Sequence, residues 1–227
     1  MRPVGILGGM GPEATILLMQ KVLAAVPAKD DADHIPLIAH QNPQVPSRIA
    51  ALIDGGGTDP GPVLSHMAQG LQAAGAQALA MPCNTAHHYA PVVENATDLP
   101  FINMITLTAA ALAASGAQRV GMLASPATRK VGVFDAAFAV QGLSPVWTPD
   151  EADMLSLIRQ VKSGAGAVQT GPLLAAQAEM LLEGGANHLL IACTELSLLT
   201  AYLPAGAGWT DSLDCLTGAV VNFATSA

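Results

Sequence analysis

The sequence predicts an α/β protein of two pseudo-symmetric lobes, each with a short, mainly parallel sheet flanked by helices. Three observations support this fold class. Short apolar strands alternate with helix-periodic segments, which is the pattern of βαβ units. The same order of strand, turn and helix occurs twice along the 227 residues. Apolar residues make up 51% of the chain and charged residues only 11%, a composition that suits close-packed helices on a buried sheet.

The first half contains two strands that are each preceded or followed by a helix. Residues 4–13 read as a short buried strand and a glycine-rich turn, and helix-periodic residues follow through Val26. A second helical stretch ends at Gly75, and residues 78–81 then form a short apolar strand that Pro82 ends. This alternation predicts a parallel sheet in the first half.

The second half repeats the pattern after residue 104. Residues 104–115 have helical periodicity, and residues 119–128 echo the opening strand and turn. Residues 173–182 form a further helix, and residues 189–192 form a buried strand.

The two halves also match in register. Residues 75–83 align with residues 185–193, and in each segment a glycine stands eight residues before a cysteine. A Leu-Pro pair closes the following helical stretch in both halves. These matching elements in one order indicate an internal duplication.

The duplication sets the expected domain boundaries. One lobe is expected to comprise residues 1–103 together with residues 206–227, and the other residues 104–205. Residues 209–214 are expected to be the strand and turn that return the chain to the first lobe.

Charge and hydropathy exclude several classes of partner. The net charge is −8, from 9 basic and 17 acidic residues without a basic cluster, so we expect no nucleic acid partner. Apolar stretches are interrupted before they reach membrane-spanning length, and the opening residues lack the apolar centre of a signal peptide. Three distant cysteines do not form a disulfide framework. We therefore expect a cytoplasmic protein with reduced thiols and no membrane association.

Two of these cysteines, Cys83 and Cys193, directly follow the matching strands. Strand ends of this kind are where open parallel sheets bind ligands. Inversion at an α-carbon needs a base on one face and an acid on the other, and two lobes with one thiol each meet this need in a cleft between them. A thiol with an ordinary pKa of about 8.5 is a plausible proton carrier once its surroundings lower that value. A helix that begins after each strand would favour the thiolate.

Other interpretations of the cysteines stay open at this point. A free cysteine is often a small core residue, and Cys215, which lacks the polar residues that follow the other two, is assigned to packing. Cys83 with His87 or His88 offers too few ligands for a metal site, so no metal is expected. A Cys83–His87 nucleophile pair would leave Cys193 without a task. The glycine-rich turn is not a dinucleotide fingerprint, although it suits a small anion.

The chain resembles the aspartate/glutamate racemase family, and its aspartate racemase branch in particular. The matching motifs span essentially the whole chain and are Leu7-Gly8-Gly9-Met10-Gly11-Pro12-Glu13, Asn42-Pro43-Gln44-Val45-Pro46-Ser47-Arg48, Met81-Pro82-Cys83-Asn84-Thr85-Ala86-His87 and Ala192-Cys193-Thr194-Glu195-Leu196. The resemblance implies a homodimeric racemase that needs neither pyridoxal phosphate nor another cofactor. It also implies that Cys83 and Cys193 act as acid and base on an amino-acid substrate and exchange roles with its chirality.

The resemblance implies further site residues. Arg48 would grip the distal carboxylate of the substrate with Lys162 as its partner, whereas without the resemblance either could be a solvated surface charge. Glu195 stands where glutamate racemases have a histidine, and it would tune the Cys193 thiol or be an ordinary helix carboxylate. The remaining substrate-binding residues implied are Met10, Asn84, Thr85, Ala86 and Thr194.

Two departures from the family pattern concern specificity. Ser47 stands where an acidic residue often precedes the arginine, and residues 103–106 lack an expected acidic residue. They leave the thiol pair untouched, and the reaction that the resemblance implies is racemisation of an acidic amino acid, aspartate before glutamate. Its alternatives are a maleate-type isomerase, a hydantoin racemase, and a protein that binds small carboxylates without catalysis.

Overall fold

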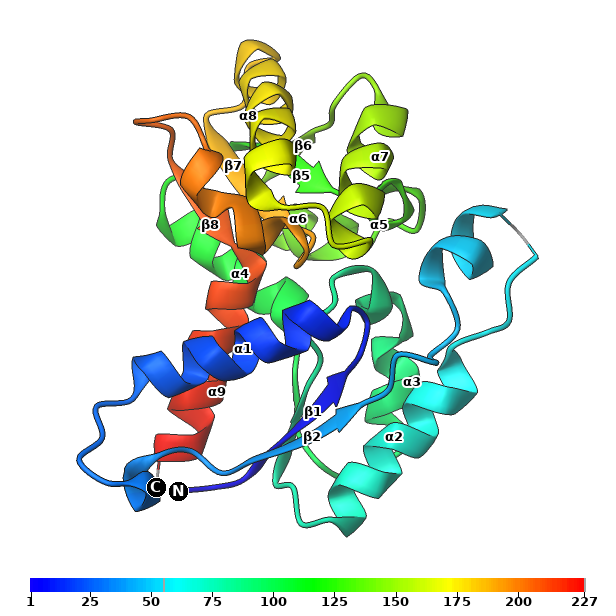
Figure 1. Ribbon diagram of the computed structural model, residues 1–227, viewed down its shortest axis with the longest axis vertical. Helices are drawn as coiled ribbons and strands as arrows, with labels where there is room; N and C mark the ends of the chain where they lie inside the picture. The colour runs from blue at the N-terminus through cyan, green and yellow to red at the C-terminus, as the bar shows by residue number, and fades with distance from the viewer. Residues whose placement is uncertain (55, 227) are drawn as a thin grey trace. The chain divides into compact units, whose positions relative to one another are not determined.

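The computed structural model of the chain describes residues 1–54 and 56–226 (Figure 1). The chain divides into two compact units. Unit 1 consists of Met1–Met104 and Leu213–Ala227, and unit 2 of Ile105–Ser212. Each unit contains a four-stranded parallel sheet flanked by helices, so the predicted fold class is confirmed.

The sheet of unit 1 is entirely parallel. Its strands, from one edge to the other, are β2 (Leu37–Gln41), β1 (Val4–Gly8), β3 (Ala78–Ala80) and β4 (Phe101–Ile102). Because β1 and β3 are central, their residues are buried on both faces of the sheet.

Helices cover both faces of this sheet. Val4 and Ile6 of β1 face one side, and Leu7 of the same strand faces the other, since side chains alternate along a strand. The first side packs against α1 (Pro12–Ala25) and α9 (Ser212–Thr225), and the second against α2 (Gly61–Ala73) and α3 (Ala90–Glu94). Figure 1 shows these two pairs on opposite sides of β1. Shorter helical turns of unit 1 are Asp31–Asp33, Ala50–Asp54 and Thr85–Tyr89.

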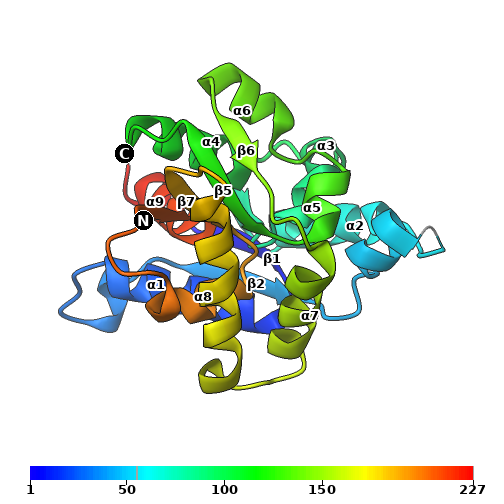
Figure 2. The same cartoon turned by 90° about the horizontal axis from the view of Figure 1, so that it is seen from above.

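Unit 2 repeats this arrangement in the same strand order. Its parallel strands, from edge to edge, are β6 (Ser144–Val146), β5 (Arg119–Ala124), β7 (His188–Ala192) and β8 (Trp209–Asp211). One face packs against α4 (Met104–Ala114) and α6 (Asp135–Gln141), and the other against α7 (Glu151–Lys162) and α8 (Ala167–Glu183). Figure 2 shows the two pairs on opposite sides of β5 and β7. Shorter helices are α5 (Pro126–Lys130) and a 3-10 helix, Leu196–Tyr202.

The chain returns to unit 1 later than residue 206, the position expected from the sequence. Trp209–Asp211 forms β8, which extends the sheet of unit 2 by pairing with β7, and the Leu189 N–H donates to the Gly208 carbonyl at 2.9 Å. These backbone bonds hold the segment before Leu213 in unit 2. Beyond it, α9 packs on the sheet of unit 1, where the Arg2 N–H donates to the Ala224 carbonyl at 2.9 Å.

No helix within the described residues is both long enough and apolar enough to cross a lipid bilayer.

Candidate active site

The Cys83 thiol lies at the carboxyl end of the sheet in unit 1. Cys83 follows β3 by a tight turn in which its N–H donates to the Met81 carbonyl at 2.8 Å. Cys83 is only 8% exposed. It belongs to the apolar cluster that packs beneath α2 and α3. A buried thiol at this edge is in the position where parallel sheets present ligand-binding groups.

His87 fixes this turn through both of its ring nitrogens. Nε2 accepts the Met104 N–H at 3.2 Å, so Nδ1 carries the proton and donates it to the Cys83 carbonyl at 2.8 Å. Burial lowers the pKa of His87 to about 4 against the opposing effect of the Cys83 hydrogen bond, and the ring is therefore neutral at pH 7. Because both nitrogens are used by the backbone, the geometry argues against a Cys83–His87 nucleophile pair.

The three residues after Cys83 lie on the same turn. Asn84 and Ala86 are buried, and Thr85 is half-buried at the start of the 3-10 helix Thr85–Tyr89. This placement puts them next to the thiol in the chain and in space. Their contact with a substrate carboxylate stays a prediction.

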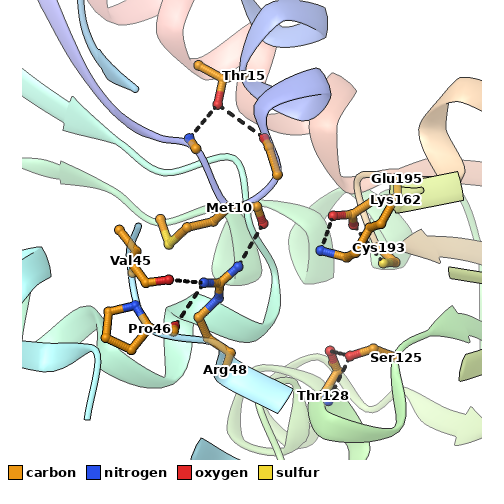
Figure 3. A network of polar contacts seen from close by, with 12 residues as sticks. Met10, Thr15, Val45, Pro46, Arg48, Ser125, Thr128, Lys162, Cys193 and Glu195 are labelled. Atoms are coloured by element: carbon orange, nitrogen blue, oxygen red, sulfur yellow. Dashed lines mark hydrogen bonds and ion pairs between the residues drawn. The ribbon is translucent and has the colours of Figure 1, made fainter. Parts of the chain in front are cut away.

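Arg48 and Met10 come together in unit 1, although 38 residues separate them in the chain. The Arg48 guanidinium donates to the carbonyls of Val45 at 3.2 Å, Pro46 at 3.0 Å and Met10 at 3.3 Å (Figure 3). Arg48 is half-buried and Met10 is buried. Arg48 is thus part of a built loop structure and is no solvated surface charge.

Thr15 holds the glycine-rich turn that carries Met10. Its hydroxyl accepts the Gly9 N–H at 2.9 Å and donates to the Gly11 carbonyl at 3.4 Å (Figure 3). Thr15 is fully buried on the first turns of α1. The threonine therefore fixes the turn from within the helix that follows it.

The Cys193 thiol ends β7 in unit 2 and belongs to a chain of polar contacts. Its Sγ donates to Glu195 Oε2 at 3.0 Å, and Glu195 Oε1 forms an ion pair with Lys162 Nζ at 2.6 Å (Figure 3). Lys162 is the last residue of α7. Thr194, which lies between Cys193 and Glu195 in the chain, is buried. Unit 2 thus brings four of the predicted site residues together.

The ionisation of Glu195 reflects these contacts. Burial favours the neutral carboxyl, but the charge of Lys162 and the hydrogen bonds from Lys162 and Cys193 outweigh it. The pKa of Glu195 therefore lies below its ordinary value, and the side chain is a carboxylate at neutral pH.

Sequence reasoning missed two polar pairs of unit 2. Ser125 ends β5 and caps α5, and its hydroxyl lies 3.1 Å from that of Thr128. The signal was a serine directly before a proline at a predicted helix start. Asp211 at the end of β8 is buried and accepts the Ser197 hydroxyl at 2.9 Å. A single aspartate at the end of a short strand did not predict this hydrogen bond.

An apolar hollow of about 420 Å³ opens at the other end of the sheet in unit 1. It is lined by Ile16, Met19, Gln20, Val22, Leu23, His34, Ile35 and Leu37. Leu37 pairs with Val4 at the start of β1, so the hollow lies at the amino end of the strands, whereas Cys83 follows their carboxyl end. Its lining offers no acid–base pair, and it is not the candidate site.

No three His, Cys, Asp or Glu side chains within residues 1–54 and 56–226 gather closely enough to hold a metal ion.

Solved structures of racemases share this fold. An aspartate racemase from Picrophilus torridus has a TM-score of 0.85 and 28% identity over 99% of this chain and 94% of its own. An aspartate racemase homologue from Pyrococcus horikoshii OT3 has a TM-score of 0.78 and 19% identity over 100% of both chains. A glutamate racemase from Francisella tularensis subsp. tularensis SCHU S4, in complex with D-glutamate, has a TM-score of 0.69 and 15% identity over 98% of this chain and 80% of its own. The last two likenesses concern the fold alone.

Sequence comparisons agree with the structural ones. An uncharacterized protein from Pectobacterium carotovorum subsp. carotovorum is 32% identical over 103 residues, which cover 43% of this chain and 66% of that protein. The match thus spans just under two thirds of its length. A family model described as Asp/Glu/Hydantoin racemase matches residues 7–219, which is nearly the whole chain. The protein therefore belongs to the Asp/Glu/Hydantoin racemase family.

Proposed function

We propose that the protein racemises an acidic amino acid, aspartate before glutamate, without pyridoxal phosphate. One observation supports this most directly. The two units have the same strand order, and in each a buried thiol with polar residues after it follows the equivalent strand, β3 or β7. A reaction that needs one proton-transfer group on each face of a carbon atom accounts for this duplication.

In the proposed reaction the two thiols have opposite tasks. A thiolate on one face of the substrate removes the α-proton, so that the C–H bond breaks and its electron pair is delocalised into the α-carboxylate. The thiol on the other face then gives its proton to the same carbon atom. Each turnover leaves Cys83 and Cys193 in exchanged protonation states, which suits the reverse reaction of the other enantiomer.

The polar surroundings of the thiols favour a dicarboxylate substrate. In unit 1, Arg48 would bind the distal carboxylate, with Met10, Asn84, Thr85 and Ala86 around the α-carboxylate. In unit 2, Thr194 would make the matching contact, Lys162 would assist Arg48, and Glu195 would tune the Cys193 thiol. The similarity to the aspartate racemase of Picrophilus torridus, at 28% identity, supports aspartate as the first substrate to test.

The decisive experiment follows the α-proton directly. Metal-free protein is incubated with L-aspartate or L-glutamate in deuterated buffer without pyridoxal phosphate, and proton NMR and chiral chromatography follow the products. The proposal expects loss of the α-proton signal and appearance of the D-enantiomer. A folded protein that exchanges neither substrate would overturn it, and maleate and hydantoins would be tested next.

Three variants separate the proposal from its rivals. C83S and C193S should each abolish racemisation, whereas C215S, whose thiol lies on α9, should racemise as the wild type does. A binding protein would keep its affinity for aspartate in both serine variants and show no exchange in the wild type. A thiol hydrolase would tolerate C193S.

Substrate protection tests whether both thiols serve one substrate. We expect aspartate to slow iodoacetamide alkylation of Cys83 and Cys193 together, measured by peptide mass spectrometry, and to leave Cys215 unchanged. Protection of one thiol alone would contradict the two-thiol mechanism. Analytical ultracentrifugation would test the homodimer that the resemblance implies.

A further inference from the structure

Two oxygens of one buried carboxylate connect a lysine to the Cys193 thiol. Glu195 Oε1 pairs with Lys162 Nζ at 2.6 Å, and Glu195 Oε2 accepts the Cys193 thiol at 3.0 Å. The three side chains come from the end of α7 and the turn after β7 (Figure 3). The contacts are therefore made between separate elements of unit 2.

The burial of Glu195 makes its ionisation depend on a cation. The side chain of Glu195 is 6% exposed and that of Lys162 is 35% exposed. A carboxylate removed from water and without a cation becomes neutral, because desolvation penalises the charged form. Lys162 on α7, Cys193 after β7 and a hydrogen bond from the backbone of Glu195 itself all favour the ionised form of Glu195.

The charge of Glu195 decides the direction of its bond to the thiol. An ionised carboxyl group has acceptors only, so the thiol must donate to it. A protonated carboxyl group has a hydrogen of its own and can donate to sulfur instead. Loss of the cation would therefore change which group holds the proton between them.

We propose that Lys162 is a positioning residue that keeps Glu195 ionised and thereby makes Glu195 the hydrogen-bond acceptor that holds the Cys193 thiol in place. The S–H bond stays intact in this contact, because a carboxylate of lowered pKa is a weaker base than a thiolate, and the proton on sulfur remains the one that Cys193 can give to the substrate carbon atom. Lys162 keeps its proton throughout. The role rests on the proposed function, in which Cys193 exchanges protons with the substrate.

This role makes the two thiols unequal. No side-chain carboxylate within the described residues hydrogen-bonds to the Cys83 thiol, whose turn is held by His87 through the backbone. The role is also compatible with a substrate contact, because an ammonium group has three N–H donors. It gives Lys162 a task before any substrate binds.

NMR of the glutamate carboxyl carbons tests the proposal directly. The chain has six glutamates, so protein labelled with ¹³C at the glutamate Cδ gives a small set of signals, and E195Q identifies that of Glu195. The signal is followed from pH 3 to pH 9 in the wild type, K162M and K162R. We expect K162M to raise the titration midpoint of Glu195 by about 1–3 pH units, the usual effect of a neighbouring opposite charge.

Two variants serve as controls for this titration. K162R keeps the positive charge and should leave the midpoint near its wild-type position. K21M breaks the ion pair of Lys21 with Asp214 in unit 1 and should leave the Glu195 signal unchanged. An unchanged midpoint in K162M, with the fold intact by circular dichroism, would overturn the proposal.

Alkylation of the thiols gives a second, independent measurement. The rate at which iodoacetamide modifies Cys193 is measured against pH, with Cys83 in the same sample as the internal reference. K162M and E195Q should move the pH midpoint for Cys193 and leave that for Cys83, and K162R should move neither. A Cys193 profile that is the same in K162M and the wild type would contradict the role of Lys162.

Both measurements use the free protein and do not depend on turnover. If the wild type exchanges no α-proton while K162M moves the Glu195 midpoint, the proposed function fails and the role of Lys162 in ionising Glu195 stands. If the wild type exchanges the α-proton and the Glu195 midpoint does not move in K162M, the proposed function stands and the role of Lys162 fails.

Discussion

Gly5 and Gly121 occupy equivalent places in the two units. A Cβ atom added to either glycine would meet its nearest neighbour at 2.9 Å in unit 1 and 2.8 Å in unit 2. In both units the neighbours are an alanine and two leucines at corresponding positions, namely Ala76, Leu71 and Leu79 around Gly5, and Ala186, Leu181 and Leu189 around Gly121. The duplication therefore extends to the packing of the central strand against the helix and strand beside it.

Alanine at either glycine should destabilise its unit. G5A and G121A insert a methyl group where no space exists, and overpacking of this kind usually costs about 1–3 kcal/mol. The helical glycines Gly70 and Gly218, whose surroundings are open, are matched controls, and G70A and G218A should gain about 0.5–1 kcal/mol. Urea denaturation measures all four. Wild-type stability in G5A or G121A would show that the strand moves aside at no cost.

His87 should make stability depend on pH between about 4 and 6.5. The unfolded residue titrates near 6.5 and the folded one near 4, so the unfolded state binds more protons within this range. The free energy of unfolding should therefore fall as the pH drops from 6.5 towards 4, by roughly 3 kcal/mol for this residue.

H87Q tests this assignment. The variant should lose most of that pH dependence in urea denaturation between pH 4 and pH 7, even if it is less stable throughout. Its exposed neighbour provides the control, since H88Q should keep the wild-type slope. Equal slopes in H87Q and the wild type would place the titration elsewhere.

The hydroxyl of Thr15 should contribute more than an ordinary buried hydroxyl. T15V leaves the buried Gly9 N–H without its acceptor, which costs about 1–3 kcal/mol. T170V also removes a buried hydroxyl, but the Gly166 carbonyl that it bonds keeps a backbone N–H donor at 3.1 Å. Thermal and urea unfolding should therefore show the larger loss in T15V. A larger loss in T170V would contradict the role of Thr15.

Arg48 should be needed for its shape as well as its charge. Within the described residues, three of its N–H groups bind backbone carbonyls, and the planar guanidinium has two more for a substrate carboxylate. A lysine cannot reproduce this fork. R48K should lower kcat/KM for aspartate by about tenfold to a hundredfold, as expected for one charge-assisted bond of about 1.5–3 kcal/mol.

R159K, at an exposed arginine of α7, is the matched control for R48K and should keep wild-type kinetics. If R48K and R159K behave alike, Arg48 serves the loop structure alone and the distal carboxylate is bound elsewhere.

Much of the fold could be predicted because the strands that follow glycine turns are short, apolar and buried on both faces. The register between residues 75–83 and 185–193 identified β3 and β7 and their cysteines without a structure. The late return of the chain could not be predicted, because the pairing of Trp209 to Asp211 with β7 depends on a backbone contact with residues about twenty positions earlier.

The ionic contacts of the candidate site were less accessible to sequence reasoning. Lys162 was expected to bind a substrate, and nothing in the spacing of Lys162 and Glu195 indicated that they form an ion pair. The packing of α7 beside the end of β7 creates that contact. Similarly, His87 and Met104 are far apart in the chain, so the sequence did not predict the hydrogen bond from the Met104 N–H to the His87 ring. That bond decides which ring nitrogen is protonated.

The interrupted course of unit 1 has a consequence for how the protein is made. Its sheet is synthesised within the first 104 residues, but α9, which covers Val4 and Ile6, follows only after all of unit 2. On the ribosome, unit 2 can therefore fold before α9 is available to cover this face of the unit 1 sheet. Until α9 is made, the apolar residues that it covers in unit 1 stay exposed, and such transient exposure is what makes folding intermediates prone to aggregation.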